Sequence, residues 1–300
     1  MLDRWGAIDL RKELEARLLG GDCRGVLERA AELLPVGAQP QPGPEAAWAA
    51  VMACRAAGAL RQWGKAIAWA ERGLAFGPNP EATGWLNLLL GTALMYTGDA
   101  FRAERCLRTF ITMAGAQPAL SRLLADGLFN LGHLLRFLRR DPAAEAETFR
   151  HAARAFAAQG RAGQVLLCHA EAAWSYLMAG QPAAALTDLQ TADAGLEQHG
   201  DPELQTYVQI CWALQYRLQG EYARSEAVCR ELEARHDLTP GQRADVAWLL
   251  AGLAQNQGDW TSAANHAERA YEQALEDLWP LQIARIEALR SSVPVRQAGR

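Results

Sequence analysis

Apolar residues recur at three- and four-residue spacing along almost the whole chain. In EATGWLNLLLGTALMYTGDAFRAERCLRTFITMA the spacing holds on both sides of Gly98, which stands at a break between two helical patterns. This period is that of an amphipathic helix, whereas a half-buried strand alternates with a period of two. No stretch alternates in that way, so the sequence predicts an all-α chain.

The breaks between helical patterns return at a nearly constant interval. Most are a glycine followed by a polar or acidic residue, as in GDA at 98 and GDW at 258, while RQW at 61 and RRDP at 139 fill two gaps. Successive breaks, starting at 21, are 40, 37, 41, 41, 40 and 38 residues apart. Glycine supplies the φ > 0 that ends one helix, and the next Asp or Gln caps the following one. The pattern predicts about seven antiparallel helix hairpins.

Small residues at fixed distances from the breaks predict where the two helices of a hairpin approach each other. Two backbones come close only where both side chains are small, and both distances carry small residues in each of six hairpins. In the fourth of the seven repeats an extra residue leaves Ala146 as an alternative to Ala144. Seven residues before the breaks stand Cys54, Gly91, Gly132, Ala173, Ala213 and Ala251, and five residues after them stand Ala66, Ala103, Ala144, Ala185, Ser225 and Ala263.

The repeats resemble the tetratricopeptide repeat (TPR) family. LLLGTAL at 88–94, FNLGHLL at 129–135 and ICWALQY at 210–216 match the family's first helix, and GDWTSAANHAERAYEQAL at 258–275 matches its second. The period near 40 departs from the family's 34, and the closing proline is mostly absent. Longer repeats of this kind are similar to those of bacterial signalling and transcription regulators. The resemblance covers about residues 45–277 and implies a right-handed α-solenoid, that is, a superhelix of stacked hairpins.

The ends of the chain depart from the repeat. Leu14 and Val26 stand where small residues stand elsewhere, so residues 1–34 are predicted to form a degenerate N-terminal hairpin or cap. The other predicted parts are a Pro/Gly-rich loop at 35–45, about six TPR-like repeats at 46–278, a capping helix at 279–290 and a disordered tail at 291–300.

Composition excludes several function classes. A net charge of −4 and a pI near 5.9 argue against nucleic acid as a partner. The chain has no HExxH, no phosphate-binding loop and no nucleophile elbow, so we expect no enzymatic activity, no metal and no cofactor. Its six cysteines form no CxxC pair and are expected to be buried thiols. The N-terminus lacks the apolar run of a signal peptide, and no apolar stretch could span a membrane, which predicts a cytoplasmic protein.

The resemblance also implies where a partner binds, because the first helix of each TPR-like hairpin lines the concave groove. In the middle repeat, Asn130, His133 and Arg136 share one helix face and suit the backbone or carboxylate of an amphipathic or aromatic peptide. In the family an asparagine at this place commonly bonds a peptide backbone, which makes Asn130 the leading candidate. The predicted contacts are Trp85, Leu88, Tyr96, Phe129, Asn130, His133, Arg136, Phe137, Trp174, Met178, Tyr207 and Arg217.

Three other uses of these large side chains stay open at this point. They can pack against the neighbouring repeat, cover the protein's own N-terminal segment, or face a second subunit in a homodimer. The function we expect is a scaffold or adaptor that binds a protein or peptide segment. The alternative is a regulator that senses a ligand or peptide and controls a separate transcription factor or effector protein.

Overall fold

The computed structural model describes residues 4–34, 44–138, 141–199, 201–277 and 280–293. Within these ranges the chain forms sixteen helices and no strand, which confirms the predicted all-α class. The chain divides into two compact units, residues 1–134 and 135–300, and the boundary falls inside one helix. The sequence contained no sign of this division, and each unit is described by itself.

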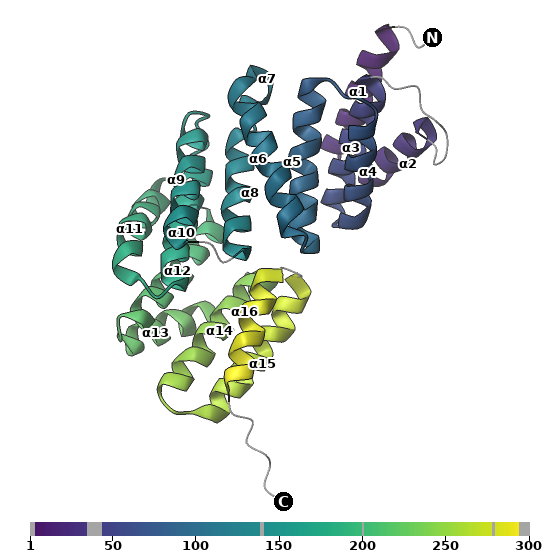
Figure 1. The fold of residues 1–300 in the computed structure, drawn as a ribbon. Coiled ribbons are helices and arrows are strands. Elements are labelled where there is room, and N and C mark those ends of the chain that lie inside the picture. The colour runs from purple at the N-terminus through teal and green to yellow at the C-terminus, as the bar shows by residue number, and fades with distance from the viewer. Residues whose placement is uncertain (1–3, 35–43, 139–140, 200, 278–279, 294–300) are drawn as a thin grey trace, which may run out of the picture. The chain divides into compact units, whose positions relative to one another are not determined.

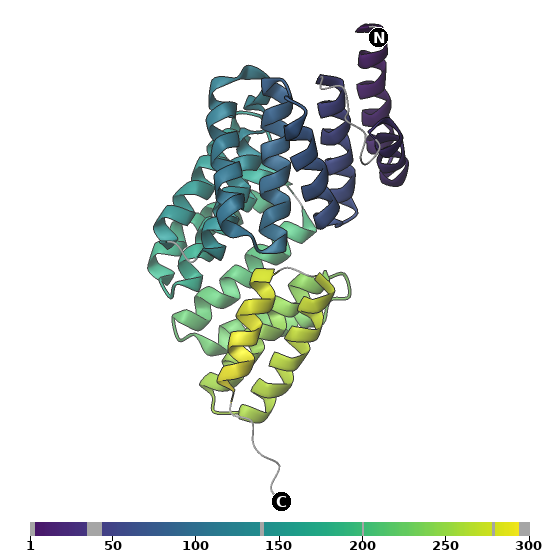
Figure 2. The same ribbon diagram turned by 45° about the vertical axis from the view of Figure 1, so that its right-hand side comes forward.

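The N-terminal unit contains three hairpins and two further helices (Figure 1). Consecutive helices from α3 to α6 lie side by side in both views (Figures 1 and 2). α7 is a single turn between the third hairpin and the helix that crosses the unit boundary. The helices are α1 (Arg4–Leu19), α2 (Cys23–Leu33), α3 (Pro44–Ala59), α4 (Trp63–Ala75), α5 (Pro80–Thr97), α6 (Ala100–Ala116), α7 (Pro118–Ser121) and α8 (Leu124–Phe137).

The C-terminal unit continues the same alternation and ends on a helix without a hairpin partner (Figure 1). In this unit α10, α12 and α14 are the first helices of three hairpins, and α16 packs on both helices of the last one. The helices are α9 (Pro142–Ala157), α10 (Ala162–Met178), α11 (Pro182–His199), α12 (Pro202–Leu218), α13 (Tyr222–Glu233), α14 (Pro240–Asn256), α15 (Trp260–Asp277) and α16 (Pro280–Ser292).

The breaks in the hydrophobic pattern are the hairpin turns. Gly98 has a φ of 86°, and the carboxylate of Asp99 accepts a hydrogen bond from the N–H of Arg102 at 3.3 Å, so both predicted roles are confirmed here. Arg61 stands at the same place of the α3–α4 turn with a φ of 54°. That region is unfavourable for a residue with a Cβ, so glycine fits this turn better than arginine does.

The predicted close approaches occur between residues twelve apart. Cys54 donates through its thiol to the carbonyl of Ala66 at 3.2 Å, and Ser225 donates to the carbonyl of Ala213 at 2.7 Å. A Cβ on Gly91 would lie 2.8 Å from Cγ of Leu107 and 3.3 Å from the carbonyl oxygen of Ala103, so only glycine fits there. The spacing of small residues therefore gave the hairpin register.

The fourth repeat departs from the first of its two predicted registers. Ala144 is exposed, whereas Glu145 is buried and Ala146 is fully buried. Cys54, Cys106, Cys168, Cys211 and Cys229 are buried as predicted, whereas Cys23 is half-buried.

The structure describes a helical hairpin near the N-terminus and a last helix near the C-terminus. Leu14 and Val26, in α1 and α2, are fully buried. Residues 35–43 of the predicted loop and 294–300 of the predicted tail lie outside the described residues, and α16 extends to Ser292. Among the described residues, no helix is both long enough and apolar enough to cross a membrane.

Candidate functional site

In the N-terminal unit, several predicted contact residues are used in helix packing. The ring of Tyr96 stacks on that of Trp63 with centroids 4.1 Å apart, and Leu88 is buried. Asn130 donates through Nδ2 to the hydroxyl of Thr92 at 2.9 Å, which links α8 to α5. One of the two amide N–H donors of Asn130 is thus used within the unit, and a contact between Asn130 and a partner stays a prediction.

The remaining predicted residues of this unit are half-buried aromatic groups. The rings of Phe129 and His133 meet edge to face, with centroids 4.7 Å apart. The guanidinium of Arg55 lies 5.2 Å from the ring of Trp85. These contacts fix the rings within the unit and leave part of each surface accessible.

Arg136 lies in a buried polar network of the C-terminal unit. Its Nε donates to Glu145 at 2.6 Å and its Nη1 to Glu171 at 2.8 Å, while the hydroxyl of Ser175 also donates to Glu145 at 2.6 Å. Burial alone would lower the pKa of Arg136, but Glu171 and Glu145 outweigh it and raise that pKa above its usual value. Arg136 therefore already has carboxylate partners within the chain.

Arg217 has a different environment in the same unit. Its guanidinium lies against the backbone of Gly252, where it fills the place that a Cβ would take, and 5.7 Å from the ring of Trp248. No carboxylate among the described residues pairs with it. Burial lowers the pKa of Arg217. Of the other predicted residues here, Phe137 is half-buried and Met178 is exposed at the end of α10.

Three first helices of the C-terminal unit bring their aromatic rings together. The ring of Trp174 from α10 lies 6.0 Å from that of Tyr207 on α12 and 6.3 Å from that of Trp248 on α14. The guanidinium of Arg285, from α16, lies 5.1 Å from Trp174 and 4.4 Å from Trp248. Trp174 and Tyr207 were predicted, whereas Trp248 and the helix that covers it were not.

A pocket with a volume of about 420 Å³ opens beside this aromatic cluster. Its walls are the N-terminal halves of the three first helices, and one residue of α16 closes it. We call it the acidic pocket. Its lining residues are Gly163, Gln164, Leu167, Glu171, Asp201, Glu203, Leu204, Tyr207, Thr239, Gly241, Gln242, Asp245 and Gln282.

The carboxylates of the acidic pocket differ in their partners. Asp245 accepts hydrogen bonds from Gln282 at 2.6 Å and from Arg285. Asp201 caps α12, accepting from the N–H groups of Glu203 at 3.0 Å and Leu204 at 3.3 Å. The Glu203 side chain is exposed and forms no ion pair with any described residue. The pocket therefore offers hydrogen-bond acceptors to a ligand.

Tyr207 supplies the aromatic wall of the pocket. Burial, followed by the nearby carboxylate of Glu171, raises the pKa of its hydroxyl well above the usual value. Tyr207 therefore stays protonated at neutral pH, and its ring is part of the pocket lining.

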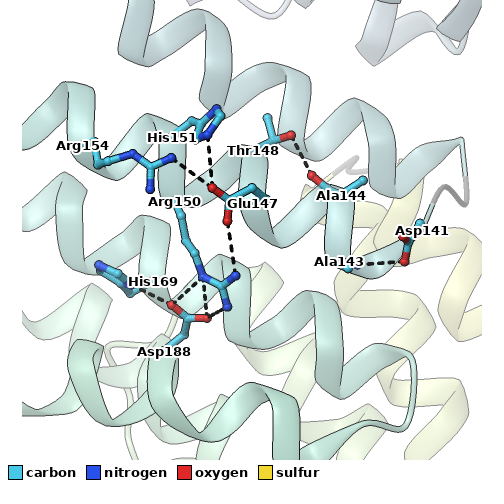
Figure 3. A network of polar contacts seen from close by, with 10 residues as sticks. All are labelled: Asp141, Ala143, Ala144, Glu147, Thr148, Arg150, His151, Arg154, His169 and Asp188. Carbon is cyan, nitrogen blue, oxygen red and sulfur yellow. Dashed lines mark hydrogen bonds and ion pairs between the residues drawn. The ribbon is translucent and has the colours of Figure 1, made fainter.

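A second polar network joins α9, α10 and α11 (Figure 3). Asp188 is 3% exposed and accepts from Nη2 of Arg150 at 2.6 Å, and its other oxygen lies 2.8 Å from Nδ1 of His169. Burial alone would raise the pKa of Asp188, but these two neighbours outweigh it and hold that pKa below its usual value. Figure 3 shows Arg150 between Asp188 and Glu147. These contacts link α9, α10 and α11.

Metal ligation and thiol chemistry are the other activities that side chains of this kind could support. No cluster of three or more His, Cys, Asp or Glu side chains in the described part of the chain could hold a metal ion. Burial raises the pKa of Cys54 and of Cys229 to about 12, so both stay as thiols at neutral pH. A thiol of that kind is a poor nucleophile.

The sequence matches no protein-family model and no curated protein. Its structure is similar to that of a tetratricopeptide repeat protein from Parabacteroides merdae, with a TM-score of 0.63 and 13% identity over 95% of this chain and 97% of that one. It is similar to the apo form of RapI, with a TM-score of 0.70 and 12% identity over 90% and 98% of the two chains. It is also similar to BtubC from P. vanneervenii, with a TM-score of 0.50 and 20% identity over 80% of this chain and 95% of that one. The chain has the TPR-like helical-repeat fold that its sequence predicts.

Proposed function

We propose that this protein is a non-enzymatic interaction scaffold that binds a segment of a partner protein at the acidic pocket of its C-terminal unit. The TPR-like helical-repeat fold fits a protein-interaction scaffold. The pocket itself is the observation that carries the proposal, because it combines the ring of Tyr207, the apolar side chains of Leu167 and Leu204 and the exposed carboxylate of Glu203 in one concave surface. Sites with a few fixed polar groups in a concave surface are typical of ligand binding.

The chemistry of the pocket supports binding over catalysis. Tyr207 is held protonated, and the carboxylates of Glu171 and Asp245 are paired with arginines behind the pocket wall. Groups fixed in this way present a constant pattern of donors and acceptors, which suits recognition.

A pocket-filling variant tests the proposal directly. Gly163 is the second residue of α10 and lines the pocket, and a Cβ built on it meets no atom within 4 Å, so Gly163→Trp adds a ring in open space. We expect peptides selected from a random displayed library by the wild-type protein to lose binding to this variant. The matched control is Gly64→Trp, since Gly64 is also the second residue of its helix with open space around it.

Selected peptides should bind the Gly64→Trp protein as they bind the wild type. Peptides that bind the Gly163→Trp protein equally well would contradict the proposal, as would a selection that enriches no sequence. Melting temperatures of both variants establish that each one folds.

A second candidate function is the sensing of a small ligand or short peptide. A volume of about 420 Å³ lies in the range of small-ligand sites. Gln282 of α16 forms one wall, so a ligand there would contact a terminal helix that an effector protein could read. Hydrogen exchange tests this second function, because a bound ligand should slow the exchange of α16 amides. An unchanged exchange rate with the ligand bound would exclude ligand sensing through α16.

A further inference from the structure

We infer that the acidic pocket binds a guanidinium group, so that the partner segment presents an arginine side chain to it. This inference rests on the proposed function and specifies the chemistry of the partner. Three independent observations support it: the charge balance of the site, one buried acceptor without a donor, and the way in which the chain binds its own arginines.

Negative charge exceeds positive charge around the pocket. Two guanidiniums, those of Arg136 and Arg285, pair with carboxylates of the wall. Five carboxylates line the pocket or join it through Arg136, against these two guanidiniums, and of the five Asp201 and Glu203 form no ion pair with any described residue. Charge of one sign in a concave surface with low-dielectric walls attracts ligands of the opposite sign. The carboxylates are those of Glu145, Glu171, Asp201, Glu203 and Asp245.

Gln282 contributes an acceptor that lacks a donor. Its side chain is largely buried, with 6% of the residue exposed, and it lines the pocket. Its Nε2 donates to the carbonyl of Gly241 at 2.7 Å and to Asp245 at 2.6 Å, whereas its Oε1 accepts no hydrogen bond from any described residue. A buried acceptor without a partner is unfavourable, so an N–H donor of a ligand gains from pairing with Oε1 when the Gln282 side chain turns it toward the pocket.

The chain already binds a guanidinium beside this pocket. Arg285 pairs with Asp245 and lies against the rings of Trp174 and Trp248, at 5.1 and 4.4 Å. The combination of a carboxylate and an aromatic face is the one that guanidinium groups favour. On the pocket side, Tyr207 supplies a ring and Glu203 a free carboxylate, which together repeat that combination.

The arrangement favours arginine over lysine. The acceptors come from α12, α14 and α16 and surround the pocket on several sides. A guanidinium presents five N–H donors in one plane and can meet several acceptors at once, whereas an ammonium is a compact point charge with three donors.

The test compares three synthetic peptides, Ac-Ala-Ala-Xaa-Ala-Ala-NH2, in which Xaa is arginine, citrulline or lysine. Citrulline has nearly the shape of arginine without its charge. Titration calorimetry at low salt should show the arginine peptide binding roughly tenfold more tightly than the citrulline peptide and more tightly than the lysine peptide. Added salt should weaken the arginine peptide most, because its binding depends on charge.

Charge-neutralising variants connect this preference to the pocket. Asp201→Asn with Glu203→Gln removes two negative charges, and asparagine still caps the helix. This protein should bind the arginine peptide roughly fivefold more weakly and the citrulline peptide unchanged. The matched control is Asp259→Asn with Glu272→Gln, because Asp259 accepts from the N–H of Ser262 at the start of α15 and Glu272 is an exposed side chain of that helix. It should bind all three peptides as the wild type does.

The outcomes separate this inference from the proposed function. Equal binding of arginine and citrulline peptides, or of arginine and lysine peptides, would overturn the assignment of a guanidinium site. Enrichment of peptides without arginine from the displayed library, with binding lost in Gly163→Trp, would also overturn it and leave the proposed function intact. Arginine-peptide binding that survives Gly163→Trp would place the site elsewhere and overturn the inference.

Discussion

Arg136 and Arg217 occupy the same place in two repeats, each three residues before its turn at 139 or 220. The side chains around the two guanidiniums differ. Arg136 donates to two buried carboxylates at 2.6 and 2.8 Å, which raises its pKa. Arg217 lies over the backbone of Gly252, and burial lowers its pKa. The repeat position fixes where a side chain points, and residues from other helices decide how its charge is stabilised.

The two environments predict opposite responses to loss of the charge. Removing one partner of a buried ion pair leaves the other charge in a poorly solvated site, which is strongly unfavourable. Removing a half-buried charge that has no counter-charge relieves desolvation and keeps the apolar contacts of the side chain. Four substitutions test this contrast.

Arg136→Met should have the largest effect. It leaves Glu145 and Glu171 buried without a counter-charge, and we expect the free energy of unfolding at pH 7 to fall by about 3–5 kcal/mol. Urea denaturation measures the change. Arg154→Met is the control, because Arg154 pairs with Glu147 on an exposed surface and its loss should cost less than about 1 kcal/mol. Equal losses in the two variants would contradict the contrast.

Asp188→Asn should have the next largest effect, because Asp188 is a buried carboxylate paired with Arg150 and His169. We expect a loss of about 1–3 kcal/mol at pH 7. The pKa of Asp188 is lowered in the folded protein, so its contribution is complete above the ordinary Asp pKa of about 3.9 and is lost as the pH falls below it. Urea denaturation at pH 7 and pH 3 should show the variant and the wild type converging at the lower pH. A difference that stays constant would mean that ionisation of Asp188 is not involved.

Arg217→Met should change stability little, with a gain of up to about 1 kcal/mol, because it removes a partly desolvated charge without a carboxylate partner. The same urea measurement as for Arg136→Met makes the two values directly comparable. A loss above about 2 kcal/mol would show that Arg217 has a stabilising partner and would remove the contrast.

Gly252→Ala should have the smallest net effect. The new Cβ would overlap the guanidinium of Arg217, which must swing away, while alanine in place of glycine favours a helix by about 1 kcal/mol. We expect the two to offset each other to within about 1 kcal/mol. In the Arg217→Met background the overlap is smaller, so the alanine should be more favourable there. A double-mutant cycle measures this coupling, and a coupling of zero would show that the two residues do not interact.

The hairpins could be predicted from the sequence because their contacts are local. Cys54 with Ala66 and Ala213 with Ser225 are twelve residues apart, so a turn residue and two small residues determine each contact. The fourth repeat was ambiguous in the sequence, and the structure has Ala144 exposed and Ala146 buried.

The acidic pocket could be predicted only in part, because its residues come from helices about 40 residues apart along the chain. Of the predicted contacts, Tyr207 lines the pocket, and it follows from its place on a first helix. The lining residue Gln282, and Arg285 that pairs with Asp245, depend on how α16 packs against α14, which no local pattern specifies. One signal was available, namely that Glu171 is an acidic residue within the apolar stretch of α10, where a carboxylate needs a buried partner.

The close approach at Gly91 has a consequence for how such a chain changes over generations. A hairpin of this protein depends on one left-handed turn residue and on two small residues, as at Gly98, Gly91 and Ala103. The other positions of the repeat need only keep their apolar or polar character, so many substitutions preserve the backbone. Chains built in this way drift apart in sequence while the helices keep their places, and surface chemistry such as the acidic pocket is free to diversify on a constant frame.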